Sequence, residues 1–172
     1  MSEKLETTFK RLMESSDLEP RQREFFEFRY LDQLTWMEGK AKTAQRSYYR
    51  LRVVTIIGAV VVPALVSLNT LNGWHGTAAQ IAAWIVSLVV AISAAIEGFF
   101  QFGQRWRNYR ATAEQLKSEG WRFFEGAEPY GSSNGSLASV FGTFAHNVED
   151  LFRKEVDTYI TKVVADKHQS GS

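Results

Sequence analysis

Residues 53–96 read VVTIIGAVVVPALVSLNTLNGWHGTAAQIAAWIVSLVVAISAAI, a run of 44 residues without Asp, Glu, Lys or Arg. The turn-forming stretch 69–76 divides this run into two apolar halves, 53–68 and 78–96. As helices the two halves would be roughly 24 and 28 Å long, close to the ~30 Å hydrocarbon core of a bilayer. We therefore predict an all-α fold built on a two-pass transmembrane helical hairpin. A soluble hairpin buried in a larger assembly is the alternative, but paired charge-free segments of this length are uncommon in soluble chains.

The basic residues that flank the two halves predict the orientation. Arginines precede the first half and follow the second, whereas the segment between them contains no Lys or Arg. By the positive-inside rule, both chain ends should be cytoplasmic and the protein should reside in the inner cell membrane as a multi-pass protein. The first 23 residues lack the features of a secretory signal, so the first half should remain in the mature chain. The arginines that we assign to topology and to the cytoplasmic mouth are Arg50, Arg52, Arg105, Arg107 and Arg110.

Apolar side chains recur at helical spacing on both sides of the membrane block. One stripe precedes it and predicts a helix that begins near Pro20, and no Pro or strong turn interrupts residues 96–124 after it. We expect long helices that extend unbroken from the spans into the cytoplasm, followed by a C-terminal amphipathic helix. The first stripe comprises Phe26, Tyr30, Leu34, Met37, Ala41, Ala44, Tyr48 and Leu51, and the last comprises Phe141, Phe144, Val148, Leu151, Phe152, Tyr159 and Val163.

These patterns predict one domain over residues 1–172. Its parts are a cytoplasmic helix 20–52, a first transmembrane helix 53–69, an extracytoplasmic loop 70–77, a second transmembrane helix 78–102, its cytoplasmic continuation 103–124, a loop 125–136, a C-terminal helix 137–166 and a disordered tail 167–172.

Composition argues against several functions. The chain has 20 basic and 19 acidic residues, a net charge of +1, which provides no global field for nucleic acid. It contains no cysteine, and its three histidines, His75, His146 and His168, lack metal-ligand spacing. The glycines of 131–135 follow no strand and lack the Lys and Ser or Thr of a phosphate loop. We therefore expect no catalytic residues, no metal, no cofactor and no enzymatic activity.

Polar side chains recur at steps of three and four residues around the end of the second apolar half. On a continuous helix they would share one face, which should meet another helix, another subunit or water rather than lipid. In a symmetric oligomer this face could line a pore, with Glu97 repeated as an acidic ring that attracts cations. The predicted lining residues are Ser93, Glu97, Gln101, Gln104 and Asn108.

Glu97 also has a second interpretation, since it lies level with Arg50 or Arg52 and could pair with either one to pin the two helices together. Beside it, small residues spaced for close helix packing are interpreted as packing rather than function. They are Ala91, Ala94, Ala95 and Gly98. Five aromatic residues are interpreted as core or interfacial rather than ligand-stacking. They are Trp36, Tyr48, Tyr49, Trp106 and Tyr109.

Motifs over roughly residues 25–160 resemble a known family. In the first part these are Tyr30 with Leu31, Trp36, Lys40 with Ala41, and YYRLR at 48–52 entering a span that contains Pro63. In the second part they are EGFFQF at 97–102, RWRNYR at 105–110, TAE at 112–114 and LKSE at 116–119, followed by Phe123, Gly126, Ala127 and Tyr130. The sequence is similar to the SLATT-type two-transmembrane family, a bacterial family whose domain of unknown function carries the number 4231.

The resemblance implies a function in bacterial conflict or defence, in which a sensor module activates an effector that forms a pore in the membrane. No sensor domain is fused to this chain, so a cytoplasmic sensor protein would have to act as a partner. We predict an oligomeric, cation-favouring ion channel whose partners are the lipid bilayer, other copies of the chain, ions and such a sensor. The alternative is a non-conducting membrane anchor or scaffold whose cytoplasmic helices recruit a partner.

Overall fold

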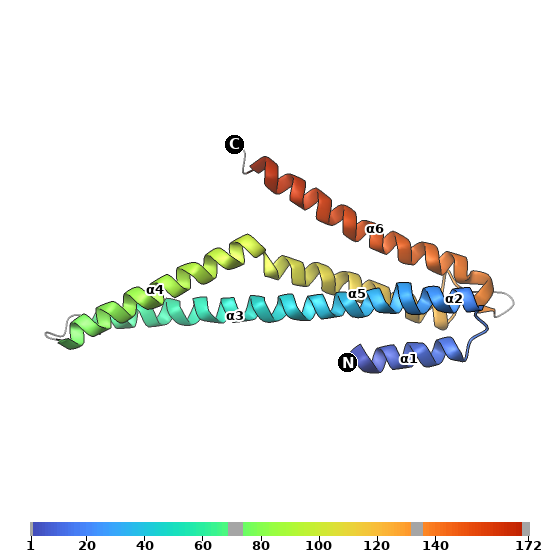
Figure 1. Ribbon diagram of the computed structural model, residues 1–172, viewed down its shortest axis with the longest axis horizontal. Helices are drawn as coiled ribbons and strands as arrows, with labels where there is room; N and C mark the ends of the chain where they lie inside the picture. The colour runs from blue at the N-terminus through green and yellow to red at the C-terminus, as the bar shows by residue number, and fades with distance from the viewer. Residues whose placement is uncertain (1, 69–73, 132–135, 170–172) are drawn as a thin grey trace. The chain divides into compact units, whose positions relative to one another are not determined.

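The computed structural model describes residues 2–68, 74–131 and 136–169, with side chains described over 4–67, 77–131 and 136–157 (Figure 1). Every regular element in these ranges is helical, which confirms the predicted all-α class. The elements are α1 (Ser2–Glu14), α2 (Pro20–Glu24), the π-helical segment η1 (Phe25–Leu31), α3 (Asp32–Leu68), α4 (Trp74–Phe100), α5 (Phe102–Phe124) and α6 (Leu137–Gln169).

The chain divides into two compact units, whereas the sequence predicted one domain. Residues Met1–Ala41 and Asn108–Ser172 form what we call the polar unit, and Lys42–Arg107 form the apolar unit. The boundary between them falls within α3 and within α5. The division follows the charge distribution, since the run without Asp, Glu, Lys or Arg lies entirely in the apolar unit.

The polar unit has an aromatic core. The apolar stripe predicted ahead of the membrane block is confirmed, because its members from Phe26 to Ala44 are all buried. At the centre, the rings of Phe26 and Tyr30 are 4.7 Å apart, and those of Phe123 and Phe144 stack at 4.5 Å. Each such ring stabilises the fold by roughly 1.5–3 kcal/mol through burial alone. From α6 the buried residues are Phe141, Phe144, Val148 and Phe152, whereas the side chains of Tyr159 and Val163 lie outside the described ones.

The π-helical segment η1 adjusts which side chains face this core. The N–H of Asp32 donates to the carbonyl of Glu27, five residues back, so the turn holds one residue more than an α-helical turn. As a result, consecutive residues Tyr30 and Leu31 are both buried, with 0 % and 2 % of their surfaces exposed. The apolar spacing of this segment predicted a helix but not this local widening.

Helix α1 was not predicted. It contributes Phe9 and Met13 to the core of the polar unit, and Leu5 and Leu12 pack against that core. These four positions recur at steps of four, three and one, which is the helical pattern, but the surrounding charged residues conceal it.

The apolar unit consists of α4 and the parts of α3 and α5 between Lys42 and Arg107. Helices α3 and α4 lie side by side (Figure 1), and they approach closely at Gly58, because a Cβ there would overlap the side chain of Val90. Val86 also comes within 4 Å of a Cβ on Gly58, and the buried residues Ala83 and Ser93 lie on the same side of α4 as Val86 and Val90. The face of α4 that meets α3 therefore repeats at steps of three and four residues, as in coiled-coil packing.

Most other side chains of these two helices are exposed. The most apolar windows of Pro20–Ser67 and Thr77–Phe100 are only 6 % and 11 % buried, whereas the core helix of a soluble protein is mostly buried. Both helices are long and apolar enough to cross a membrane. Large exposed apolar residues include Ile56, Val60, Ile81, Trp84, Ile85, Leu88, Val89 and Phe99.

Two predicted boundaries differ from the observed helix ends. Helix α4 begins at Trp74, inside the predicted loop 70–77, and residues 69–73 lie outside the described part of the chain. Helix α6 continues to Gln169, so the first residues of the predicted disordered tail 167–172 are helical. The polar residues at the end of α6 were interpreted as a tail, but none of residues 167–169 is Pro or Gly, which would have ended the helix.

Candidate functional site at the junction of α4 and α5

A single residue, Gln101, separates α4 from α5, and the chain bends there (Figure 1). Its φ of 49° lies in the left-handed region, which stops an α-helix. The N–H of Gln101 still donates to the carbonyl of Glu97, completing α4, and its own carbonyl accepts from Gln104 and Arg105, starting α5. The expected unbroken helix across this point is therefore wrong, because one left-handed residue is enough to redirect the axis.

The side chain of Glu97 spans this break. Its Oε1 accepts a hydrogen bond from the backbone N–H of Gly103, at 3.2 Å. That N–H belongs to the first turn of α5, where backbone donors lack helical partners and the helix dipole favours a negative charge. Glu97 thus caps α5 from the preceding helix. Its Oε2 is buried and has no hydrogen-bond partner among the described residues.

Tyr48 of α3 packs against the start of α5, next to the break at Gln101. A Cβ on Gly103 would lie 2.9 Å from Cε2 of Tyr48, so glycine allows that ring to pack directly on the first turn of α5. Tyr48 also stacks on Trp106 with 6.2 Å between ring centroids, and Tyr49 lies 5.8 Å from the same indole. Three of the five aromatic residues predicted to be core or interfacial, Tyr48, Tyr49 and Trp106, therefore form a cluster where α3 and α5 meet, and Trp36 and Tyr109 pair with each other in the polar unit.

The predicted pore-lining residues do not share one helical face, because the helix breaks at Gln101. Ser93 is buried on the side of α4 that meets α3, and Glu97 is half-buried. Gln101 and Gln104 are exposed beyond the break. Asn108 belongs to the polar unit, where its carbonyl accepts from the hydroxyl of Thr112.

The arginines assigned to the cytoplasmic mouth are all exposed. Arg110 pairs with Glu114 at 2.8 Å. Within the described residues, Glu97 forms no ion pair with Arg50 or Arg52, contrary to the helix-pinning interpretation, because the carboxylate turns toward Gly103 instead.

Sequence reasoning missed a second polar cluster, which is buried in the polar unit around Glu119. Its Oε1 accepts from the hydroxyl of Tyr130 and, at 2.8 Å, from Nδ2 of Asn147, and its Oε2 accepts from Arg122 at 3.1 Å. The cluster ties α5, the segment after it and α6 together. The signal was available, because Glu119 lies three residues after Leu116 and four before Phe123, on an otherwise apolar stripe.

Burial and the Glu119 carboxylate also affect the nearby tyrosines. Burial raises the pKa of Tyr130 well above its usual range, and the hydrogen bond that it donates to Glu119 raises it further. Burial likewise raises the pKa of Tyr30, with a smaller contribution from the negative charge of Glu119. Both hydroxyls are therefore protonated donors at neutral pH. The Tyr130 hydroxyl that faces the Glu119 carboxylate is buried, with 1 % of the residue exposed, so we interpret the cluster as structural.

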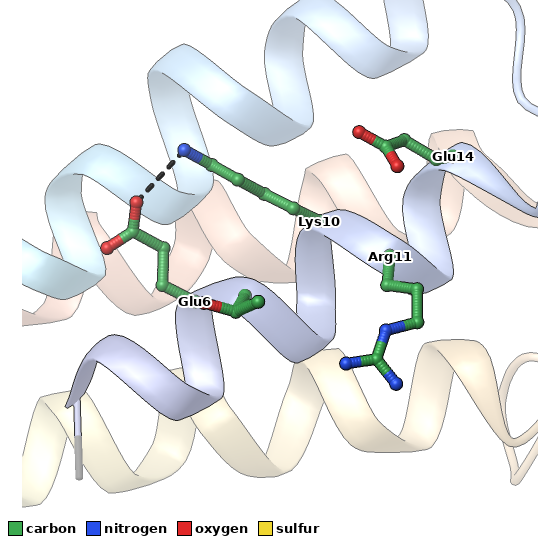
Figure 2. Close-up of a pocket in the computed structure, with 5 residues that line it drawn as sticks. Glu6, Lys10, Arg11 and Glu14 are labelled. Carbon is green, nitrogen blue, oxygen red and sulfur yellow. Dashed lines mark ion pairs between the residues drawn. The ribbon is translucent and has the colours of Figure 1, made fainter.

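The remaining surface features suggest no chemistry. A pocket along α1 is lined by Glu6, Thr7, Lys10, Arg11 and Glu14, with Lys10 paired to Glu6 at 3.0 Å (Figure 2). All five side chains come from α1, and the four charged ones are two acids and two bases, so the pocket has no excess charge of either sign. In the part of the chain that the structure describes, no group of three His, Cys, Asp or Glu could hold a metal ion.

Fold and site together define an all-α protein in which two helices are long and apolar enough to cross a membrane and a carboxylate caps the helix that follows the second. The family model of proteins of unknown function called DUF4231 matches residues 32–153. The chain belongs to this family, as the resemblance predicted. Comparisons with curated proteins and with solved structures give no match. The SLATT designation remains a prediction.

Proposed function

We propose that this chain is an integral membrane protein whose α3 and α4 form a two-pass transmembrane hairpin, and whose copies assemble into an oligomer that passes ions and favours cations. Both chain ends and the polar unit lie on the cytoplasmic side of the inner cell membrane. A cytoplasmic sensor protein is proposed as the activating partner.

Insertion is supported by the exposed apolar surface of the two helices. Val60 and Trp84, for example, are 70 % and 73 % exposed. Monomeric soluble proteins rarely expose contiguous apolar surface on this scale, whereas lipid would cover it favourably. Helix α4 has 27 residues and is about 40 Å long, which is enough to cross a ~30 Å core with tilt. The orientation follows from the arginines at the ends of the two spans that lie away from the 69–73 connection.

The observation that carries ion passage is the buried Oε2 of Glu97, which has no partner among the described residues. A buried carboxylate oxygen without a donor is costly, so water, a cation or a group from another copy should satisfy it. Two spans cannot enclose an aqueous path, so several copies are required. Repeated around such a path, Glu97 would attract cations and repel anions.

The test is single-channel recording from purified full-length protein in planar bilayers, with reversal potentials in a salt gradient. Glu97→Gln removes the charge but keeps a side-chain oxygen that can accept from Gly103, so the helix cap is preserved. Glu97→Lys reverses the charge. Glu114→Gln, an exposed carboxylate of the polar unit, is the matched control.

We expect discrete cation-favouring currents that lose selectivity in Glu97→Gln and shift toward anions in Glu97→Lys, with the control unchanged. Currents that are identical in all four proteins would remove Glu97 from the path. Silence from a correctly folded oligomer supplied with its lipids would favour the second candidate.

The second candidate is a non-conducting membrane anchor whose polar unit recruits a partner. It is favoured by the use of Ser93 and Glu97 within the chain itself, the first buried against α3 and the second capping α5. A dimer without an aqueous path, measured by mass in detergent, together with electrical silence would support it. An anchor also predicts that Glu97→Gln leaves partner capture by the polar unit unchanged.

A further inference from the structure

The apolar unit carries a concentrated and uncompensated positive charge. Between Lys42 and Arg107 lie six basic residues and one acid, Glu97, so the unit has a net charge of +5 although the whole chain has +1. The single acid is already engaged with the N–H of Gly103. We call five of the basic residues the basic collar. They are Arg46, Arg50, Arg52, Arg105 and Arg107.

The guanidinium groups of the basic collar are exposed and have no carboxylate partner among the residues that the structure describes. Exposed arginines usually find carboxylates when these are near, but here the sequence places none within reach on α3 or on the first turn of α5. The guanidinium groups of the collar are therefore available to bind an anion from outside the chain.

The aromatic cluster sets where the arginines of the collar lie along α3 relative to those of α5. Tyr48 contacts both Gly103 and Trp106, which sets the register between α3 and α5. Arg46 and Arg50 each lie two residues from Tyr48 in the sequence, and Arg105 and Arg107 flank Trp106 in α5. The arginines of both elements therefore lie at about the same level along the helices as the aromatic cluster.

The length of the collar along α3 is slightly greater than the thickness of a headgroup layer, so its arginines can reach across that layer. From Arg46 to Arg52 the helix rises about 9 Å. The polar layer of one leaflet is about 5–8 Å thick, given a total bilayer of 40–45 Å around a 30 Å core. Tyr and Trp prefer this same layer, because their rings are apolar and their polar groups remain hydrated.

We propose that the basic collar binds the phosphate groups of anionic phospholipids in the cytoplasmic leaflet. Each guanidinium presents two parallel donors to a phosphate, a geometry that lysine cannot reproduce. The inference rests on the proposed membrane insertion. It goes beyond orientation, because it predicts bound anionic lipid rather than only the side on which the arginines remain.

The experiment counts lipids retained by the full-length protein. Protein reconstituted in nanodiscs of equal phosphatidylglycerol and phosphatidylcholine is released into detergent, and bound lipids are identified by native mass spectrometry. The test variants are Arg50→Gln with Arg105→Gln and Arg50→Lys with Arg105→Lys. The control is Arg11→Gln with Arg21→Gln, which removes the same charge from exposed arginines of the polar unit.

We expect the native chain to retain phosphatidylglycerol preferentially, and the Arg→Gln pair to lower that preference roughly 25-fold, about fivefold for each charge removed. The Lys pair should retain part of the preference, and the control should match the native chain. Equal retention of both lipids by the native protein, or an equal loss in the control, would overturn the proposal. Each variant is first shown to have the thermal midpoint of the native protein.

Two further measurements separate the remaining outcomes. Carbonate extraction of membranes tests insertion, so a chain that washes off refutes the proposed function, whereas an inserted chain without lipid preference refutes only the collar. Titration with a single-stranded RNA of random sequence tests another polyanion. If the Gln pair loses RNA binding while lipid retention is unchanged, the collar is a nucleic-acid site and the lipid proposal is wrong.

Discussion

The hydroxyl of Tyr30 donates a hydrogen bond to the backbone carbonyl of Leu116, 2.7 Å away, and so joins η1 to α5 inside the core of the polar unit. The approach depends on Gly120, since a Cβ at that position would overlap the Tyr30 hydroxyl. One glycine and one hydroxyl thus set the spacing of two helices that are 86 residues apart in sequence.

This contact predicts a coupled pair of substitutions. Tyr30→Phe should lower the free energy of unfolding by about 1 kcal/mol, because it removes one buried hydrogen bond. Gly120→Ala should cost about 1–3 kcal/mol, because the added methyl displaces the Tyr30 ring. The double variant should cost less than the sum, since removing the hydroxyl opens space for the methyl. Urea unfolding of the four proteins gives the coupling energy, and strict additivity would show that residues 30 and 120 do not share this space.

The Glu119 cluster predicts that a substitution that keeps the size of the side chain will still lower the stability of the polar unit. Glu119→Gln keeps the size of the side chain but replaces one acceptor oxygen with a donor, which would face Tyr130, Asn147 or Arg122. We expect the free energy of unfolding to fall by about 2 kcal/mol, in the range for lost hydrogen bonds to a charged group. Chemical denaturation measures it, with Glu114→Gln as the exposed control that should change stability little. Equal losses from Glu119→Gln and Glu114→Gln would show that the buried cluster contributes no more to stability than an exposed carboxylate does.

Stability should also fall at alkaline pH in a way that depends on two tyrosines. Folding raises the pKa of Tyr30 and Tyr130 above the ordinary value of 10.0, chiefly through burial. Above about pH 10 the unfolded chain therefore loses these protons while the folded chain keeps them, so the contribution present below pH 10 declines as pH rises. Urea midpoints between pH 9 and about 11 should fall less steeply in the double Tyr→Phe variant. Parallel curves for the native and variant proteins would contradict this assignment.

The sequence predicted the helical class and much of the polar core because both depend on periodicity. The stripe through Phe26, Tyr30, Leu34 and Met37 is the buried one, since burial follows side-chain spacing on a helix. Helix α1 obeys the same rule at Phe9, but its short apolar pattern is surrounded by charges.

The candidate site was harder to predict because it depends on one backbone angle. Gln101 carries no Gly or Pro signal, yet its φ of 49° ends α4 and divides the expected polar face. Gln lacks the local preference for the left-handed region that Gly, Asn and Asp have, so tertiary contacts must select that conformation at Gln101. Here the contacts are the Glu97 cap on Gly103 and the packing of Tyr48 on the same residue, neither of which a linear pattern reveals.

Two glycines of the apolar unit should respond oppositely to the same substitution. Gly58→Ala places a methyl against Val90, so α3 and α4 must separate, and we expect a loss of about 1–3 kcal/mol. Gly98→Ala meets nothing within 4 Å in the chain, so helix propensity should make it neutral or stabilising by up to about 1 kcal/mol. Thermal unfolding in detergent compares them, and equal losses would show that α3 and α4 do not pack closely at Gly58. Size-exclusion chromatography of Gly98→Ala adds a second readout, since a smaller particle with unchanged unfolding would place Gly98 at a contact between copies in the proposed oligomer.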